Sequence, residues 1–123
     1  MEEKIESLFN DIDSMDADKF ASYLDDNVTF SFGNAPPAIG KKAARDAVEG
    51  FFKSIKGISH KKIRVWINPD SIFYQGTSTY TRHDDSKITL PFLDLFLMNG
   101  DKIIDYKIYM DINPLFSDAK DEI

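Results

Sequence analysis

Asp94 is the residue whose setting in the sequence most favours a chemical role. It lies in an alternating apolar run at residues 90–98, and with a period of two it shares a strand face with Phe92 and Phe96. An ionised carboxylate is costly to bury in such a run, so we expect the pKa of Asp94 to rise unless the group is paired. A protonated carboxyl donates a hydrogen bond that can stabilise an enolate or hold a ligand carbonyl. The alternative is a structural carboxylate that a tyrosine, a threonine or a backbone amide satisfies.

The two histidines differ in their surroundings. His60 begins a strand directly after a predicted helix, and its near-neutral pKa makes it a candidate general base, with a solvated or capping role as the alternative. His83 borders the acidic pair Asp84 and Asp85, and we interpret it as a surface residue. Neither histidine has the i, i+4 spacing of a zinc site, and the chain contains no cysteine. We therefore predict no metal and no cofactor.

Helical and strand periodicities occupy separate blocks of the chain. Apolar residues at helical spacing predict three helices, and alternation predicts five strands that are joined by turns. The predicted helices cover residues 2–14, 16–24 and 41–55, and the predicted strands cover residues 28–32, 61–67, 72–83, 88–98 and 102–111. Helices that precede a meander of long strands predict an α+β fold, in which three N-terminal helices pack on one face of a curved antiparallel sheet.

The composition limits the number of domains and the classes of partner. The chain of 123 residues has room for one domain, which we assign to residues 1–116, and we expect the acidic tail at residues 117–123 to be disordered. A net charge of −6 argues against nucleic acid and anionic membranes as partners. The N-terminus has no pattern of a secretion signal and the longest apolar stretch is far too short to span a bilayer, so we expect a cytoplasmic protein.

Three stretches of the sequence are similar to one group of small α+β proteins. The run Phe-Leu-Asp-Leu-Phe-Leu-Met at residues 92–98, with the turn Gly-Asp-Lys-Ile at residues 100–103, resembles a strand and turn of the ketosteroid isomerases. Residues 23–28 with Gly33 and Gly40 are similar to the helix-to-strand passage of that family, and residues 106–111 resemble the last strand of SnoaL-like polyketide cyclases. The resemblance implies the nuclear transport factor 2-like (cystatin-like) fold, a cone-shaped mixed sheet around an apolar pocket.

This resemblance also implies roles for particular residues. The acidic oxyanion donor of the isomerases falls on Asp94, and a supporting pocket tyrosine falls on Tyr23. The general-base aspartate falls on or beside Ser31, and the oxyanion-hole tyrosine falls on Leu8 or Phe9. The steroid isomerase reaction itself therefore lacks its usual base in this chain.

The pocket that the resemblance implies has apolar walls and one polar row. The expected wall residues are Leu8, Phe9, Tyr23, Phe52, Phe92, Phe96, Tyr106 and Met110. The resemblance turns the polar row of the strand at residues 72–83 toward the cavity, where it would orient ligand oxygen atoms, whereas exposure to solvent is the other interpretation. This row comprises Gln75, Thr77, Thr79 and Thr81, of which the first three are the candidate ligand contacts.

Two functions of different class fit these features. The first is a pocket for a small hydrophobic, oxygenated molecule such as a steroid, polyketide or terpenoid fragment. If this protein is an enzyme, we expect cofactor-free isomerisation, cyclisation or hydration, with Asp94 as the acid and His60 as the base. The rival is a non-catalytic binding or interaction module, because fold alone does not decide function. In either case we expect a homodimer through the outer sheet face, where Trp66 lies beside Lys62 and Arg64.

Overall fold

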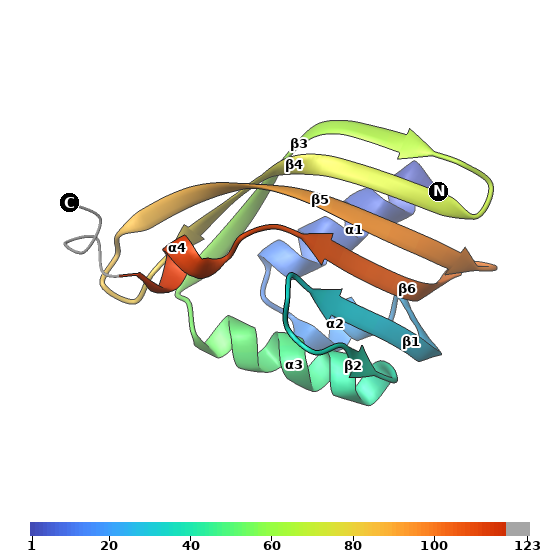
Figure 1. Cartoon of the computed structure of the whole chain (residues 1–123), viewed down its shortest axis with the longest axis horizontal. Helices are drawn as coiled ribbons and strands as arrows, with labels where there is room; N and C mark the ends of the chain where they lie inside the picture. Colours follow the sequence, from blue (N-terminus) through green and yellow to red (C-terminus); the bar gives the residue numbers. More distant parts are fainter. Residues whose placement is uncertain (118–123) are drawn as a thin grey trace.

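The computed structural model describes residues 1–117 and has one curved sheet with three helices against its inner face (Figure 1). The helices are α1 (Glu2–Asp13), α2 (Ala17–Ala21), α3 (Lys41–Lys53) and α4 (Asn113–Phe116). The strands are β1 (Leu24–Phe32), β2 (Ala38–Ile39), β3 (Gly57–Ile67), β4 (Ser71–Thr81), β5 (Lys87–Asn99) and β6 (Lys102–Tyr109). This architecture confirms the predicted α+β class.

The six strands form a single mixed sheet in the order β2–β1–β6–β5–β4–β3. Strand β1 runs parallel to β6, and every other neighbouring pair is antiparallel. Strands β3 to β6 form a meander, in which long hairpins keep neighbouring segments in register over most of their length. The sheet curls around the helices, so that its inner face is concave and its outer face is uncovered (Figure 1).

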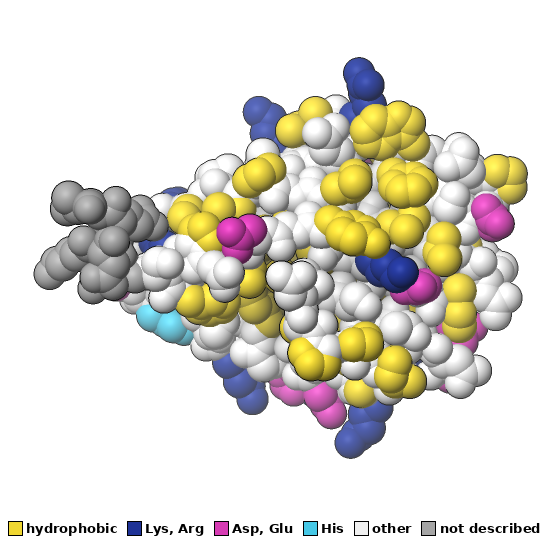
Figure 2. Space-filling model, viewed as in Figure 1, with side chains coloured by type: hydrophobic (Ala, Val, Ile, Leu, Met, Phe, Trp, Pro, Cys, Tyr) yellow, Lys and Arg dark blue, Asp and Glu magenta, His cyan; other side chains and the backbone are white. Residues whose placement is uncertain are grey.

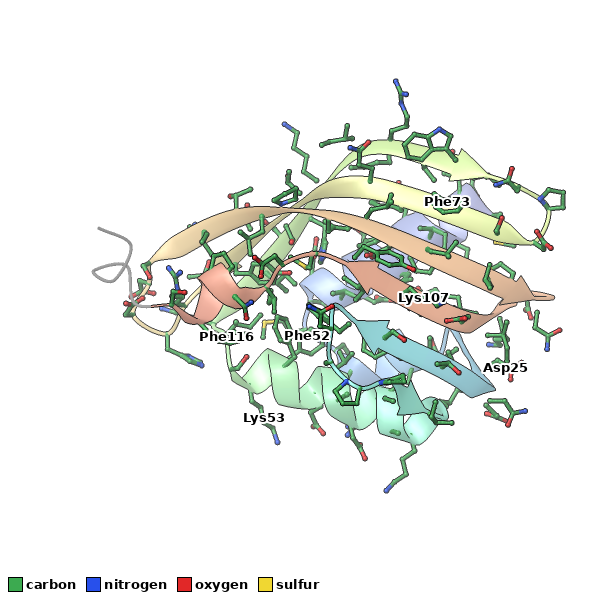
Figure 3. The ribbon with its side chains drawn as sticks, in the orientation of Figure 1. Asp25, Phe52, Lys53, Phe73, Lys107 and Phe116 are labelled. Carbon is green, nitrogen blue, oxygen red and sulfur yellow. The ribbon has the colours of Figure 1, made fainter. Side chains whose placement is uncertain are left out.

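Each long helix buries one stripe of its surface against the sheet. Helix α1 buries Ile5, Leu8, Phe9 and Ile12, which recur at the i, i+3, i+4, i+7 spacing of a helical face. Helix α3 buries Ala44, Val48 and Phe52 at intervals of four. Phe52 extends from α3 toward the sheet (Figure 3). These stripes form the main core together with the inner faces of the strands.

The second helix is shorter than its periodicity predicts. The Asp16 carboxylate caps its N-terminus by accepting a hydrogen bond from the Lys19 backbone N–H at 3.0 Å. The helix ends at Ala21, and Leu24 already pairs with Ile103 as the first residue of β1. The Tyr23 carbonyl accepts a hydrogen bond from the Ile103 N–H, so residues 23 and 24 pair with a distant strand instead of continuing the helix. Local periodicity cannot predict a partner so far away in the sequence.

A bulge in β3 changes the predicted faces of that strand. Simple alternation places Ile63 and Trp66 on opposite faces and Lys62 beside Trp66. The register with β4 shifts between Lys62 and Arg64, so Ile63 and Trp66 both open onto the outer face. Lys62 turns inward, where its Nζ lies 3.1 Å from carboxylate oxygens of both Glu2 and Glu6 on α1.

The chain after β6 folds back as a short helix rather than as the end of a strand. Strand β6 ends at Tyr109, and α4 begins at Asn113 with a proline in its first turn. The Arg82 guanidinium fixes α4 by donating hydrogen bonds to the carbonyls of Pro114 and Leu115 at 2.9 and 2.8 Å. The predicted acidic tail lies, apart from Ser117, outside the described residues.

Candidate functional site

An apolar cavity of about 280 Å³ lies between the concave face of the sheet and the helices. Nearly half of its lining residues are phenylalanine or tyrosine, which suits a flat hydrophobic molecule. The phenylalanines that line it are Phe20, Phe30, Phe32, Phe51, Phe52, Phe92 and Phe116. Phe116 belongs to α4, so the C-terminal helix contributes to the wall (Figure 3). The lining also includes five side chains with hydroxyl, imidazole or carboxyl groups, which are His60, Ser78, Tyr80, Asp94 and Tyr106.

Asp94 projects from β5 into this cavity with only 2% of its surface exposed. Its Oδ2 accepts a long hydrogen bond of 3.5 Å from the Tyr106 hydroxyl, and its Oδ1 has no hydrogen-bond partner within residues 1–117. Burial raises the pKa of Asp94 well above its usual value, against a smaller lowering by the Tyr106 hydrogen bond. The neutral form is therefore favoured, and its proton is available for a ligand oxygen.

Tyr106 supports this role from the neighbouring strand β6. Burial, and then the negative charge of Asp94, raise the pKa of Tyr106 well above its usual value, so its hydroxyl stays protonated. The hydroxyl donates to Oδ2 and leaves Oδ1 as the oxygen that faces an acceptor. The ring of Tyr106 packs edge-on against Phe30 and Phe96, with centroids 5.2 and 4.5 Å away. This packing fixes the direction of the hydroxyl.

His60 forms a dyad with Asp13, the last residue of α1. Its Nδ1 lies 2.5 Å from Asp13 Oδ1, and its backbone N–H donates to Asp13 Oδ2 at 3.1 Å. A carboxylate at Nδ1 fixes the tautomer in which Nδ1 carries the proton and Nε2 carries the lone pair. The imidazole also packs on Phe9 and Phe92, with centroids 4.9 and 5.4 Å away. An oriented imidazole at an apolar cavity is an arrangement that suits a general base.

The sequence contains no signal that identifies Asp13. It is separated from His60 by 47 positions, and it lies in an acidic helix whose other carboxylates look equivalent in sequence. Only the packing of α1 against β3 brings the two residues together. The pairing of His60 with Asp13 therefore follows from tertiary packing and cannot be found from the sequence alone.

Ser78 and Tyr80 form a pair of hydroxyl groups on the cavity wall. Ser78 and Tyr80 lie on the inner face of β4, and both are buried. The Ser78 Oγ donates to the Tyr80 hydroxyl at 3.0 Å, and that hydroxyl points to the Met110 Sδ at 3.6 Å. Burial raises the pKa of Tyr80 to about 12, so its hydroxyl remains a donor at neutral pH. The sequence analysis did not select either residue.

The cavity brings together six of the residues that the sequence analysis selected. These are His60, Phe52, Phe92, Asp94, Tyr106 and Met110. Leu8, Phe9 and Phe96 are buried in the main core beside the cavity rather than in its lining. They support the wall from behind, as the contact of Phe9 with His60 illustrates.

Tyr23 and Ser31 do not have the places that the resemblance implies. The Tyr23 hydroxyl donates to Asp11 Oδ2 at 2.6 Å outside the cavity, and burial together with this hydrogen bond raises the pKa of Tyr23 to about 12. Ser31 lies between Phe30 and Phe32 on β1. Because those two rings face the cavity, strand alternation turns Ser31 to the opposite side.

The polar row of β4 lies on the outer face, so the expectation that it faces the cavity is wrong. Residues of the opposite parity, including Tyr74, Ser78 and Tyr80, are the buried ones on this strand. The candidate ligand contacts of this row are Gln75, Thr77 and Thr79. Gln75 is exposed, and the Thr79 hydroxyl pairs with that of Thr89 across the outer surface at 2.8 Å.

The outer face of the sheet carries an apolar groove, which we call the outer groove. Hydrophobic side chains gather there over β3, β4 and β5 (Figure 2). The groove is lined by Ile63, Trp66, Phe73, Gln75, Gly76, Pro91, Phe92, Leu93, Tyr109, Met110 and Asp111. Trp66 is 42% exposed, and the Arg64 guanidinium lies 5.6 Å from its ring centroid.

The sequence and the fold together identify the family. A model of the SnoaL-like domain matches residues 5–106, so the chain belongs to the SnoaL-like domain family. No curated protein is similar enough to match. Within residues 1–117, no helix has the length and apolar character that crossing a membrane requires.

Solved structures share this fold at low sequence identity. An NTF2-like protein of unknown function from Burkholderia pseudomallei has a TM-score of 0.83 at 11% identity, covering 93% of this chain and 92% of the other. TerC, co-crystallised with polyporic acid, has a TM-score of 0.80 at 15% identity and 93% coverage of both chains. A putative polyketide cyclase from Xanthomonas campestris has a TM-score of 0.80 at 14% identity and 90% coverage of both. These similarities confirm the predicted fold.

Proposed function

We propose that this protein binds a flat, hydrophobic, oxygenated molecule and acts on it by cofactor-free acid/base chemistry. The observation that carries the proposal is the Asp94 carboxyl, which is buried in an aromatic cavity with Oδ1 unpartnered among the described residues. A buried polar atom without a partner costs free energy, and a ligand oxygen that accepts its proton would recover that loss. TerC, a protein of the same fold, was co-crystallised with an organic acid, which is compatible with such a pocket.

His60 and Asp94, two of the polar residues of the cavity, would have different roles in the reaction. His60, held by Asp13, would take a proton from the ligand at Nε2. Asp94 would donate a hydrogen bond to the ligand oxygen that gains negative charge, and this interaction strengthens as the charge develops. Return of the proton to another carbon completes an isomerisation. In a cyclisation, the enolate carbon attacks a second carbonyl to form a C–C bond and an alkoxide, and the alkoxide takes the proton back from His60.

The simple bicyclic ketone 1-tetralone is a suitable first probe of this proposal. We expect it to raise the thermal midpoint of the wild-type protein, and we expect the protein to accelerate exchange of its α-protons in D₂O, measured by NMR. Asp94→Asn should reduce both effects, because an amide donates a weaker hydrogen bond to an oxyanion than a carboxylic acid does. Thr77→Val, on the outer face, is the control. Absence of stabilisation by 1-tetralone and by a wider set of ketones and phenols would count against a working pocket.

The outer groove favours a second function, that of a dimeric binding module. Ile63, Trp66 and Tyr109 are large apolar side chains that remain 59%, 42% and 54% exposed on one sheet face. We propose that a second copy of the chain covers this face, because an isologous pair of sheets would bury all three residues. Sedimentation of the wild type at micromolar concentration should give a dimer, and Trp66→Glu should give a folded monomer. A monomeric wild type would exclude this arrangement, and it would leave the acid/base proposal standing.

A further inference from the structure

We propose that Ser78 and Tyr80 form a second polar subsite of the cavity, separate from Asp94, which binds a second oxygen atom of the ligand. The inference rests on the proposed function and narrows its ligand to a class, namely conjugated ketones that carry a distal hydroxyl or carbonyl group.

The hydroxyl pair is incompletely satisfied although it is buried. Ser78 donates its proton to Tyr80, and Tyr80 has only the Met110 thioether as an acceptor, at 3.6 Å. Sulfur in a thioether is a weak acceptor compared with oxygen. Within the described part of the chain, neither hydroxyl oxygen accepts a bond from a second donor. A ligand oxygen can therefore replace the thioether as the acceptor of Tyr80, or donate to the free lone pairs of Ser78.

Strand register sets the distance between the two subsites. Tyr74 on β4 is the direct partner of Asp94 on β5, and Ser78 lies four residues further along β4. At the rise of a strand, this separation is about 13 Å between backbone positions. The distance between the polar groups is shorter, because both side chains point into the same cavity. The Tyr80 ring leans back toward Ser78, since its hydroxyl meets the Ser78 Oγ. A rigid molecule of about two rings fits this span.

The base lies along the same wall, between the two subsites. His60 on β3 is the direct cross-strand partner of Ser78, and its imidazole packs on the Phe92 ring, with centroids 5.4 Å apart. Phe92 precedes Asp94 by two residues on β5. A ligand with its ketone at Asp94 and a distal oxygen atom at the hydroxyl pair would bring the carbon next to the ketone toward His60. The arrangement therefore selects ligands that carry two oxygen atoms on one flat framework, and conjugation keeps such a framework flat and rigid.

The pair 1-tetralone and 6-hydroxy-1-tetralone tests this subsite. The two molecules share one framework and one ketone, and only the second carries a distal hydroxyl in conjugation with the carbonyl. We expect the wild-type protein to bind 6-hydroxy-1-tetralone about 3- to 10-fold more tightly, which is the effect of one added hydrogen bond. Titration calorimetry of both compounds against each variant measures this preference.

Tyr80→Phe should abolish the preference and leave the affinity for 1-tetralone within about twofold of wild type. Ser78→Ala should reduce the preference, and because it removes a single oxygen it provides a second test if Tyr80→Phe does not fold. Tyr74→Phe is the matched control: Tyr74 is buried on the same strand, but it packs on Phe9 at 4.2 Å outside the cavity lining. This variant should keep the preference, and circular dichroism should give native spectra for all three.

The outcomes separate the two proposals. A preference that survives in both Tyr80→Phe and Ser78→Ala would overturn the second subsite. If the wild type binds both ketones equally and Asp94→Asn weakens both, the subsite is overturned and the acid/base pocket is retained. If the wild type binds neither compound, the subsite and the proposed ligand class are both wrong.

Discussion

The two faces of the sheet are built from the same strands but differ in how their polar groups are used. On the inner face, the polar side chains around Asp94 are buried and have weak partners, as with the 3.5 Å bond between Tyr106 and Asp94, while His60 has a close partner in Asp13. On the outer face, polar groups are partly exposed and meet good partners, as with Thr79 and Thr89 at 2.8 Å. Water satisfies the exposed outer groups, whereas the inner groups depend on what occupies the cavity, whether water or a ligand. Unused hydrogen-bonding capacity of buried groups is therefore concentrated on the inner face.

The largest expected effect comes from the base on the inner face. His60→Gln should lower the rate of 1-tetralone proton exchange by about 100-fold or more, which is the usual contribution of a general base, while changing affinity little. Asp13→Asn should lower the rate less and alter its pH profile, because Asp13 acts only by orienting the imidazole.

The other histidine provides the control for this prediction. The His83 Nε2 lies 3.0 Å from the Lys53 carbonyl, and His83 is not among the residues that line the cavity. His83→Gln should therefore leave the exchange rate unchanged. Equal losses in His60→Gln and His83→Gln would show that the first variant acts through general damage to the fold rather than through the base.

Asp94→Asn should change how stability depends on pH. The folded-state pKa of Asp94 is raised by burial, so folding favours the protonated carboxyl. Wild-type stability is then complete below the unfolded pKa, near 4, and falls as pH rises toward the folded pKa, by up to about 1.4 kcal/mol per pH unit. Tyr106 and Tyr80 face the same cavity, but their raised pKa values keep them neutral over this range.

The amide variant lacks this ionisation and should gain stability relative to wild type between pH 5 and pH 8. Urea unfolding of both proteins across that range measures the difference. A difference that stays constant with pH would mean that the Asp94 carboxylate ionises as easily in the folded protein as in the unfolded chain. The acid role proposed for Asp94 would then fail.

Gly76 connects the two faces, because it lies opposite the bulge in β3. A Cβ at this position would lie 2.4 Å from the Lys61 carbonyl oxygen and 3.0 Å from the Phe92 ring. Gly76→Ala should therefore destabilise the protein by about 1–3 kcal/mol, which is the usual effect of overpacking. Gly50→Ala is the matched control on α3, where a Cβ meets no atom within 4 Å, and it should stabilise the helix by roughly 0.5–1 kcal/mol. Opposite signs in thermal unfolding would confirm the close approach at Gly76.

Alternation predicts the inner face of β5 and of β4, whereas the family resemblance gives the wrong face for β4. Asp94 is flanked by Phe92 and Phe96 at a period of two, and the structure keeps that alternation. On β4 the buried set, which includes Ile72, Tyr74 and Tyr80, alternates with the polar row, which includes Gln75, Thr77 and Thr79, so periodicity favours exposure of the row. The resemblance turns this row toward the cavity, and that expectation is wrong.

Contacts between distant segments also exceed what periodicity can predict. The bulge in β3 alters which residues share a face. One extra residue in a strand does not change its composition enough for the bulge to be predicted from the sequence. The link between Asp13 and His60 depends on where α1 lies on the sheet, which follows from the packing of the whole core. The class of fold is encoded locally in patterns of spacing, whereas the partners within the site are encoded only in the assembled structure.

The smallest expected effect compares two adjacent residues that point to opposite faces. Thr77 and Ser78 are neighbours on β4, with Thr77 on the outer face and Ser78 fully buried at the cavity. Thr77→Ala should change the free energy of unfolding by no more than about 0.5 kcal/mol and should leave affinity for 6-hydroxy-1-tetralone unchanged. Ser78→Ala should weaken that affinity severalfold, because it removes a hydroxyl whose lone pairs face the ligand. Equal weakening by the two substitutions would mean that a residue on the outer face of β4 affects binding as much as one at the cavity. The proposal that the ligand binds at the inner face would then be wrong.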